Sequence, residues 1–228
     1  MSTDLPLAPT SFLREDSTSN PEQLYQQLRA WFAPHSRVIV AFSGGIDSAL
    51  VLRAAIDAPG NKKIIAFTGD SPSLARSELQ EATSYAASLA VEHLILKTNE
   101  LYDEEYLANK GDRCYYCKKT LYRTLTDHLQ YSPEKDGLTD TQIPVARYVI
   151  VDGTHLGDVG DYRPGLRAAK EFDVKHPLQD AKLGKIEIRA ISNFLGISIA
   201  EKPESACLSS RITIGNRVST EKLAAIER

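Results

Sequence analysis

The part of the sequence best suited to binding a phosphate is a run of six residues with two glycines, two serines and one aspartate. The run consists of Ser43, Gly44, Gly45, Ile46, Asp47 and Ser48. An apolar stretch at 37–42 precedes it and a helix-periodic stretch at 48–58 follows, which predicts a strand, a tight turn and a helix. Glycines let the backbone approach a ligand, and the first N–H groups of a helix lack partners within it. We therefore predict an anion site at this turn.

The side chains of this run add detail to that prediction. Ser43 and Ser48 carry hydroxyl groups that can cap the helix or donate to a phosphate oxygen. Asp47 would repel a phosphate unless a metal ion bridged the two groups, and this favours Mg²⁺. The alternative is an ordinary turn between a strand and a helix, in which the same residues serve as a cap and bind nothing.

The three cysteines are the second group of residues with chemical potential. Cys114 and Cys117 are spaced to lie on one side of a helix, a pattern found in redox pairs, zinc sites and apolar cores alike. Cys207 is far away in the sequence, and Ser210 and Arg211 close to it are residues suited to a pocket. If the three thiols converge, they could hold zinc with a histidine, or a 4Fe-4S cluster with one open iron. The alternative is that Cys207 is an unrelated buried cysteine.

Apolar strand-like runs alternate with amphipathic segments along the chain. We predict strands at 37–42, 64–68, 92–97 and 148–151. We predict helices at 20–32, 48–58, 75–89, 185–195 and 219–228, together with one that begins near residue 114 and another that ends at residue 172. This alternation implies right-handed crossovers and a doubly wound parallel α/β sheet. Residues 131–146 lack an apolar period, and we predict a surface excursion there.

Ligands of such a sheet bind beyond the carboxyl ends of its strands. Thr68 ends the second predicted strand and is a candidate, by position alone, for lining an adenosine pocket. The fourth strand delivers residues 152–154 to the same edge, and His155 is the histidine that we place near the site. Arg163 and Arg211 lie in loops rich in glycine, proline or serine, where arginine suits a phosphate or a carboxylate.

The composition narrows the class of protein. The chain has 228 residues, of which 42% are hydrophobic, and its formal net charge of -3 argues against a nucleic-acid partner. Three cysteines are an odd number, better suited to a reducing compartment than to disulfides. No apolar run reaches membrane-spanning length and the start has no signal pattern, so we expect a cytoplasmic protein without a membrane partner. We divide the chain into a flexible tail (1–19), an ATP-binding domain (20–203) and a final segment (204–228).

The run from Ser43 to Ser48 resembles the PP-loop of ATP pyrophosphatases, which cleave ATP between the α and β phosphates. Two further motifs, DYRPG at 161–165 and PESACLSSR at 203–211, are similar to those of the LarE family of ATP-dependent sulfur transferases. This resemblance spans nearly the whole chain. It implies the PP-loop, adenine nucleotide alpha hydrolase-like fold with a truncated C-terminal appendage.

The resemblance also implies a reaction, the synthesis of the nickel-pincer nucleotide. A carboxylate of the small-molecule substrate, pyridinium-3,5-dicarboxylate mononucleotide, would be adenylated by ATP with Mg²⁺, and sulfur would then replace AMP. Cys207 matches the cysteine that delivers sulfur in this family. Ser210 and Arg211 match the segment expected to hold the substrate phosphate, and Arg163 lies in a loop expected near it.

The cysteines point to one subtype of that family. The family has two subtypes. In one, a single cysteine gives up its own sulfur and ends as dehydroalanine; in the other, three cysteines hold a 4Fe-4S cluster. The resemblance implies the second subtype, with Cys114, Cys117 and Cys207 as the cluster ligands. Such a cluster would relay sulfide from a sulfur donor. The chain departs from the family pattern at His155, where we expect asparagine, and it stops where members continue into a region that completes the substrate pocket and the oligomer. We expect a homo-oligomer on this basis.

Three other functions compete with this interpretation. A PP-loop tRNA thiolation enzyme also combines an ATP loop with three cysteines and a cluster, but such enzymes often carry lysine at the position of Ile46 and a basic stripe with aromatic residues. A non-catalytic nucleotide-binding module stabilised by zinc is a second alternative. An amidating or NAD-forming synthetase is a third, although such an enzyme would not need three cysteines.

Overall fold

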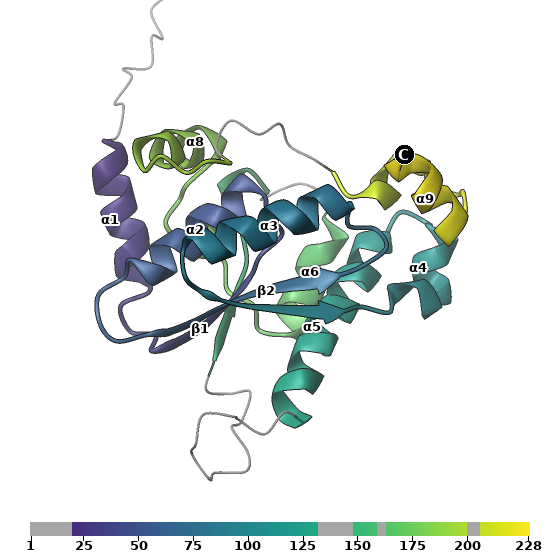
Figure 1. Cartoon of the computed structure of the whole chain (residues 1–228), viewed down its shortest axis with the longest axis horizontal. Helices are drawn as coiled ribbons and strands as arrows, with labels where there is room; N and C mark the ends of the chain where they lie inside the picture. Colours follow the sequence, from purple (N-terminus) through teal and green to yellow (C-terminus); the bar gives the residue numbers. More distant parts are fainter. Residues whose placement is uncertain (1–19, 132–147, 159–162, 200–205) are drawn as a thin grey trace, which may run out of the picture.

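The computed structural model describes residues 20–131, 148–158, 163–199 and 206–228. Within these ranges, four parallel strands form one sheet with the order β3-β2-β1-β4 (Figure 1). The strands are β1 (Arg37–Ala41), β2 (Lys63–Asp70), β3 (Glu92–Lys97) and β4 (Val149–Val151). The two central strands are in register with Ile39 opposite Ile65, and Ile39 also lies opposite Ile150 of β4.

The alternation of side chains along β1 explains why the sheet is covered on both faces. Val38 and Val40 belong to one apolar core, and Ile39 and Ala41 belong to a second core on the opposite face. Successive residues of a strand point to opposite faces, so a continuous apolar run requires cover on both sides. The predicted doubly wound sheet is confirmed by this arrangement.

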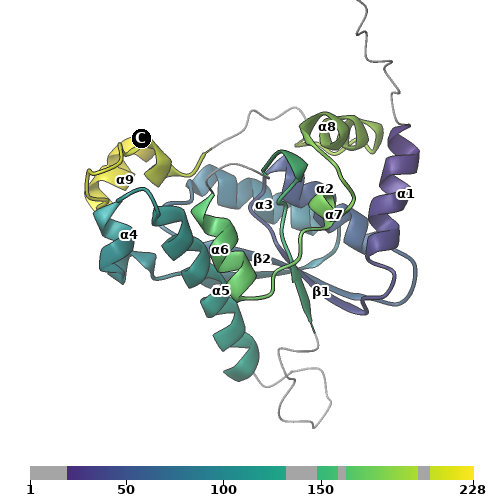
Figure 2. The same ribbon diagram turned by 180° about the vertical axis from the view of Figure 1, so that it is seen from behind.

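Helices from separate parts of the chain cover the two faces of the sheet (Figures 1 and 2). On one face lie α1 (Pro21–Trp31), α2 (Ile46–Ile56), α3 (Arg76–Ser88), α7 (Pro177–Asp180) and α8 (Lys185–Phe194). On the other face lie α5 (Arg113–Tyr131) and α6 (Pro164–Glu171). The α2 helix is buried along most of its length, which fits its position between the sheet and the outer helices.

A third apolar cluster joins the end of the chain to the segment before α5. It contains Tyr106 of α4 (Glu104–Ala108), Leu208 of the 3₁₀ turn Leu208–Arg211, and Leu223 of α9 (Thr220–Glu227). Figures 1 and 2 both show α9 lying beside α4, away from α1 and α8. This cluster places the turn that follows Cys207 next to the N-terminal end of α5.

Most predicted elements are present, with ends that differ by a few residues. The strand at 92–97 is confirmed exactly, and the second strand extends to Asp70 rather than ending at residue 68. The predicted cap of the first helix is also confirmed, because the Asn20 side chain accepts a hydrogen bond of 3.0 Å from the Glu22 N–H. The predicted tail at 1–19, most of the excursion at 131–146 and the division after residue 203 lie outside the described residues.

The sheet core predicts a clear contrast between two isoleucines. Ile39 is fully buried in the centre of β1, whereas Ile186 on α8 is 81% exposed. We expect Ile39→Ala to lower the free energy of unfolding by about 2 to 5 kcal/mol, because it leaves a cavity in the core. The matched control Ile186→Ala should change it by less than about 0.5 kcal/mol. Urea unfolding followed by circular dichroism measures both values, and equal losses would contradict the assignment of the core.

Candidate active site

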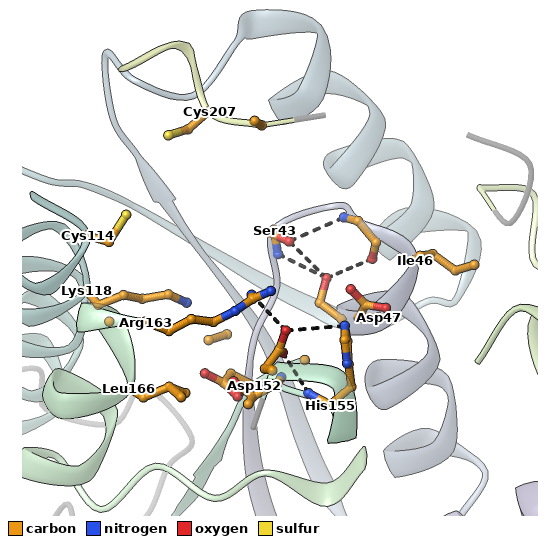
Figure 3. Close-up of a pocket in the computed structure, with 18 of the residues that line it drawn as sticks. Ser43, Ile46, Asp47, Cys114, Lys118, Asp152, His155, Arg163, Leu166 and Cys207 are labelled. Atoms are coloured by element: carbon orange, nitrogen blue, oxygen red, sulfur yellow. Dashed lines mark hydrogen bonds and ion pairs between the residues drawn. The ribbon is translucent and has the colours of Figure 1, made fainter. Parts of the chain in front are cut away.

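One pocket of about 640 Å³ lies at the carboxyl edge of the sheet, where the loops after β1 and β4 meet (Figure 3). It is bounded by the residues after β1 on one side and by the first turns of α5 and α6 on the other. The polar and sulfur-bearing residues that line it are Ser43, Asp47, Ser48, Glu78, Cys114, Lys118, Asp152, Thr154, His155, Asp158, Arg163, Lys185 and Cys207. The predicted phosphate loop, two of the three cysteines and one of the two predicted arginines therefore share one pocket.

The loop between β1 and α2 depends on its first glycine. Gly44 has a φ of +81°, and a Cβ atom at this position would lie 3.2 Å from the Ala82 Cβ on α3. An L-residue is strained with such a backbone, so the sequence uses glycine here. Ser48 and Ser43 brace the turn: the Ser48 hydroxyl donates to the Gly45 carbonyl (2.9 Å), and the two hydroxyls lie 3.2 Å apart.

The N-terminal end of α2 faces the pocket. Its N-cap residue is Gly45, which has no side chain to accept a hydrogen bond from the first N–H groups of the helix. The loop after β4 approaches this end closely, since a Cβ at Gly153 would lie 2.8 Å from the Ser48 nitrogen. Any larger residue at 153 would push the two loops apart. The uncapped N–H groups and the helix dipole make this end of α2 suitable for binding an anion.

Asp47 carries the carboxylate nearest to that helix end. Its Oδ2 atom forms an ion pair of 2.8 Å with the Lys185 ammonium at the start of α8. Its Oδ1 atom is buried and has no hydrogen-bond partner in the described structure. A carboxylate oxygen in that state is a suitable ligand for Mg²⁺, which prefers carboxylates and phosphate oxygens.

Asp152 is a buried carboxylate in the wall of the pocket. It accepts hydrogen bonds from the Tyr122 hydroxyl (3.0 Å) and the Thr154 N–H (3.0 Å), and its Oδ1 lies 2.8 Å from the His176 Nδ1. Burial by itself would raise the pKa of Asp152. The hydrogen bond with His176 and the charge of Lys118 outweigh burial and hold this pKa well below its ordinary value.

Lys118 brings a positive charge to the α5 side of the pocket. The Tyr122 hydroxyl group and, more weakly, Asp152 keep its pKa above the ordinary value although the side chain is partly buried. Figure 3 shows Lys118 and Arg163 extending into the pocket from the side opposite Ser43 and Asp47. Arg163 pairs there with Asp158, with 2.7 Å between Nη1 and Oδ1. The pocket can thus hold a ligand that carries negative charge at several points.

The cysteines fall into two environments. Cys114 and Cys207 are exposed, and both line the pocket (Figure 3). Cys117 is partly buried against the third apolar cluster, and burial raises the pKa of its thiol to about 12, with smaller contributions from Glu100, Cys207 and Cys114. Among the described residues, no three side chains of the types His, Cys, Asp and Glu are grouped so that they could hold a metal ion.

Five of the predicted site residues do not line the pocket: Gly44 and Cys117, described above, and Thr68, Ser210 and Arg211. Thr68 is only 2% exposed, and its hydroxyl donates to the Phe42 carbonyl (2.6 Å), so the structure does not bring it to an adenosine site. Ser210 and Arg211 are exposed on the turn after Cys207 but do not line the pocket. The Ser210 hydroxyl donates to the Cys207 carbonyl (2.6 Å) and so helps to shape that turn.

Sequence reasoning missed two positive charges of the pocket. Lys118 follows Cys114 by four residues, so the helical spacing could have placed both side chains on one face of α5. Lys185 is 138 residues away from its partner Asp47, and no local signal in the sequence connects them. No helix in the described ranges has the length and apolarity needed to cross a membrane.

Comparisons with known proteins agree with this geometry. The chain is 36% identical over 207 residues to an uncharacterized protein from Synechocystis, covering 91% of this chain and 72% of that protein. It is 32% identical over 190 residues to the pyridinium-3,5-bisthiocarboxylic acid mononucleotide synthase of Lactiplantibacillus plantarum, covering 83% of this chain and 64% of that enzyme. No family model matches the chain.

A solved structure supports the fold. The NMN synthetase from Francisella tularensis superimposes with a TM-score of 0.58 at 17% sequence identity, covering 91% of this chain and 92% of that one. At this identity the likeness shows the PP-loop fold and nothing about the substrate. The similarity in sequence to the Lactiplantibacillus synthase shows that this chain belongs to the LarE family of PP-loop ATP-dependent sulfur transferases.

Proposed function

We propose that this chain adenylates a carboxylate of pyridinium-3,5-dicarboxylate mononucleotide with ATP and then replaces AMP by sulfur to give a thiocarboxylate. The observation that carries the proposal is that the anion-binding end of α2 and two exposed thiols line one pocket. An adenylating site and a sulfur-delivering site must share the activated carbonyl carbon, so their proximity is what the reaction requires. The name of the Lactiplantibacillus relative supports the choice of substrate.

The first half of the reaction forms a leaving group. A carboxylate oxygen of the substrate attacks the α-phosphorus of ATP, and the bond to the β-phosphate oxygen breaks to release pyrophosphate. The turn at Gly44 and Gly45 and the N–H groups of α2 would hold the phosphates, and Lys185 would lie beside the departing pyrophosphate. The free oxygen of Asp47 would bind Mg²⁺, which offsets the charge that develops on the phosphates.

The second half transfers sulfur. A sulfur nucleophile attacks the carbonyl carbon of the acyl adenylate, and the carbon–oxygen bond to AMP breaks, so that AMP leaves as an anion. Lys118 and Arg163 would hold the negative charges of the substrate on the side of the pocket opposite α2. Cys114 and Cys207 are the exposed thiols on the pocket wall, and they lie where a sulfur donor has to reach the substrate.

We further propose that Cys114, Cys117 and Cys207 hold a 4Fe-4S cluster. Each of the three thiolates would bind a different iron of such a cluster, which leaves the fourth iron open. Burial is the main cause of the raised pKa of Cys117, but Cys207 and Cys114 contribute to it, which supports placing the three thiols near one another. When bound, such a cluster supplies an open iron that can carry sulfide.

The role of Asp47 predicts a selective loss of the first half-reaction. We expect Asp47→Asn to lower ATP-dependent pyrophosphate release in the presence of substrate by at least about a hundredfold, because charge stabilisation at the phosphates is lost. The matched control is Asp173→Asn, whose carboxylate is 86% exposed and pairs only locally with Lys175. Pyrophosphate measured by a coupled assay gives the answer. Normal release by Asp47→Asn would remove this residue from the ATP site.

The role of Cys207 predicts that the two half-reactions can be separated. Cys207→Ser should still exchange pyrophosphate with ATP when the substrate is present, since the ATP loop is untouched, but it should form no thiocarboxylate. Pyrophosphate exchange measures the first half-reaction, and mass spectrometry of the product measures the second.

Cys114→Ala distinguishes two sources of the transferred sulfur. A cluster needs Cys114, so this variant should form no thiocarboxylate if a cluster relays sulfide. A sacrificial Cys207 would still react once and leave dehydroalanine in the protein.

The cluster proposal predicts the metal content of the purified chain. Under anaerobic conditions we expect about four iron and four acid-labile sulfide per chain, as a 4Fe-4S cluster requires, with a broad visible absorbance. Cys114→Ala should lose both, while Lys119→Ala, at a non-cysteine position on the same helix, should keep them. Stoichiometric zinc without iron would contradict the cluster and favour a zinc-stabilised nucleotide-binding module.

A further inference from the structure

Two buried polar side chains hold the segment that carries Cys207 against α4 and α5. Arg113 is 8% exposed and Asn109 is 1% exposed. The Arg113 Nη1 donates to the Ser209 carbonyl (2.6 Å) and to the Asn109 Oδ1 (2.9 Å). A hydrogen bond from a charged donor in a buried place is among the stronger polar contacts in a protein. These two residues therefore form a joint between distant parts of the chain.

Asn109 extends the joint to the residues that follow the turn. Its side-chain amide donates to the carbonyls of Ile212 (3.3 Å), Thr213 (3.0 Å) and Asn216 (3.0 Å). Its backbone has a φ of +51°, a conformation that asparagine adopts more readily than most residues. The backbone adds two bonds of 2.9 Å, from the Gly215 N–H to the Asn109 carbonyl and from the Val218 N–H to the Leu107 carbonyl.

The position of this joint in the sequence links it to the two exposed thiols. Arg113 is the residue immediately before Cys114, and Ser209 is two residues after Cys207. The bond from the Arg113 side chain to the Ser209 carbonyl thus ties together the backbones that carry Cys114 and Cys207. On the far side of the turn, the Leu208 N–H donates to the Ser73 carbonyl (2.9 Å), which leaves the turn little freedom to shift.

We propose that Arg113 is a positioning residue that sets the separation of the Cys114 and Cys207 thiols across the pocket. The proposal rests on the proposed function in so far as the two thiols act together on sulfur. Lysine could not replace this arginine without loss, because its side chain is one bond shorter and its ammonium group would not reach the position of the Arg113 Nη1. In Arg113→Lys the buried Ser209 carbonyl and Asn109 amide oxygen would therefore lose a well-placed charged donor.

The separation of the two thiols can be measured with a bridging reagent on the full chain after metal removal. The probe is a rigid ortho-phenylene bismaleimide, which gives one bridged adduct when two thiols are held close and two single adducts when they are not. Intact mass and peptide mapping count both products. Cys117 serves as an internal control of folding, because its side chain packs against the third apolar cluster and is less accessible than the two exposed cysteines.

We expect the wild-type chain and the control Arg123→Lys, an exposed arginine on the same helix, to give mainly the bridged adduct. Arg113→Lys should lower the ratio of bridged to doubly labelled protein by about tenfold, as expected from the loss of one charge-assisted hydrogen bond, while Cys117 stays unlabelled. An unchanged ratio in Arg113→Lys would overturn the assignment. Labelling of Cys117 in that variant would also overturn it, because the effect would then come from unfolding.

The same experiment separates this proposal from the proposed function. If the wild-type chain forms no bridge, the thiols of Cys114 and Cys207 do not meet, and the sulfur half of the proposed reaction fails together with the role of Arg113. If the wild-type chain forms the bridge and Arg113→Lys forms it equally well, only the role of Arg113 fails. Pyrophosphate release by Arg113→Lys should remain near the wild-type value, since Arg113 does not contact the ATP loop.

Discussion

The arrangement of the pocket depends on the hydrogen bonds and the ion pairing of one buried carboxylate, that of Asp152. It joins the end of β4 to α5 through Tyr122 and to the segment before α7 through His176. A charge in this position is costly unless hydrogen bonds and a cation offset its loss of hydration. The carboxylate has three hydrogen-bonding partners, and Lys118 supplies the positive charge. The same contacts that stabilise Asp152 therefore fix the helix that presents Cys114 and Lys118 to the pocket.

The sheet and the phosphate loop could be predicted from the sequence because their signals are local. The apolar run of β1 places successive side chains on opposite faces of the sheet, and the two glycines after it mark a turn at which Gly44 takes a positive φ. The strand at 92–97 is marked by its apolar centre, Leu94, Ile95 and Leu96. Local patterns of this kind need no knowledge of the rest of the fold.

The contacts between distant segments could not be predicted in this way. Thr68 shows the difference, because the apolar run predicts its strand whereas only the register of the folded sheet decides the direction of its side chain. Side chains alternate along a strand, and at this register the hydroxyl points to the Phe42 carbonyl rather than to the pocket. The pairing of Lys185 with Asp47 and of Arg113 with Ser209 depends on tertiary packing alone, since neither pair has a sequence spacing that would reveal it.

The environments of the three cysteines suggest different tasks for residues that look alike in the sequence. A buried thiol with a raised pKa resists oxidation and alkylation, whereas an exposed thiol reacts according to its thiolate fraction. Cys117 belongs to the first kind, while Cys114 and Cys207 belong to the second and line the pocket. Formation of a metal cluster would require Cys117 to lose its proton, and metal binding supplies the driving force for that loss. In the proposed cluster, the partly buried Cys117 would therefore act as an anchor rather than as a nucleophile.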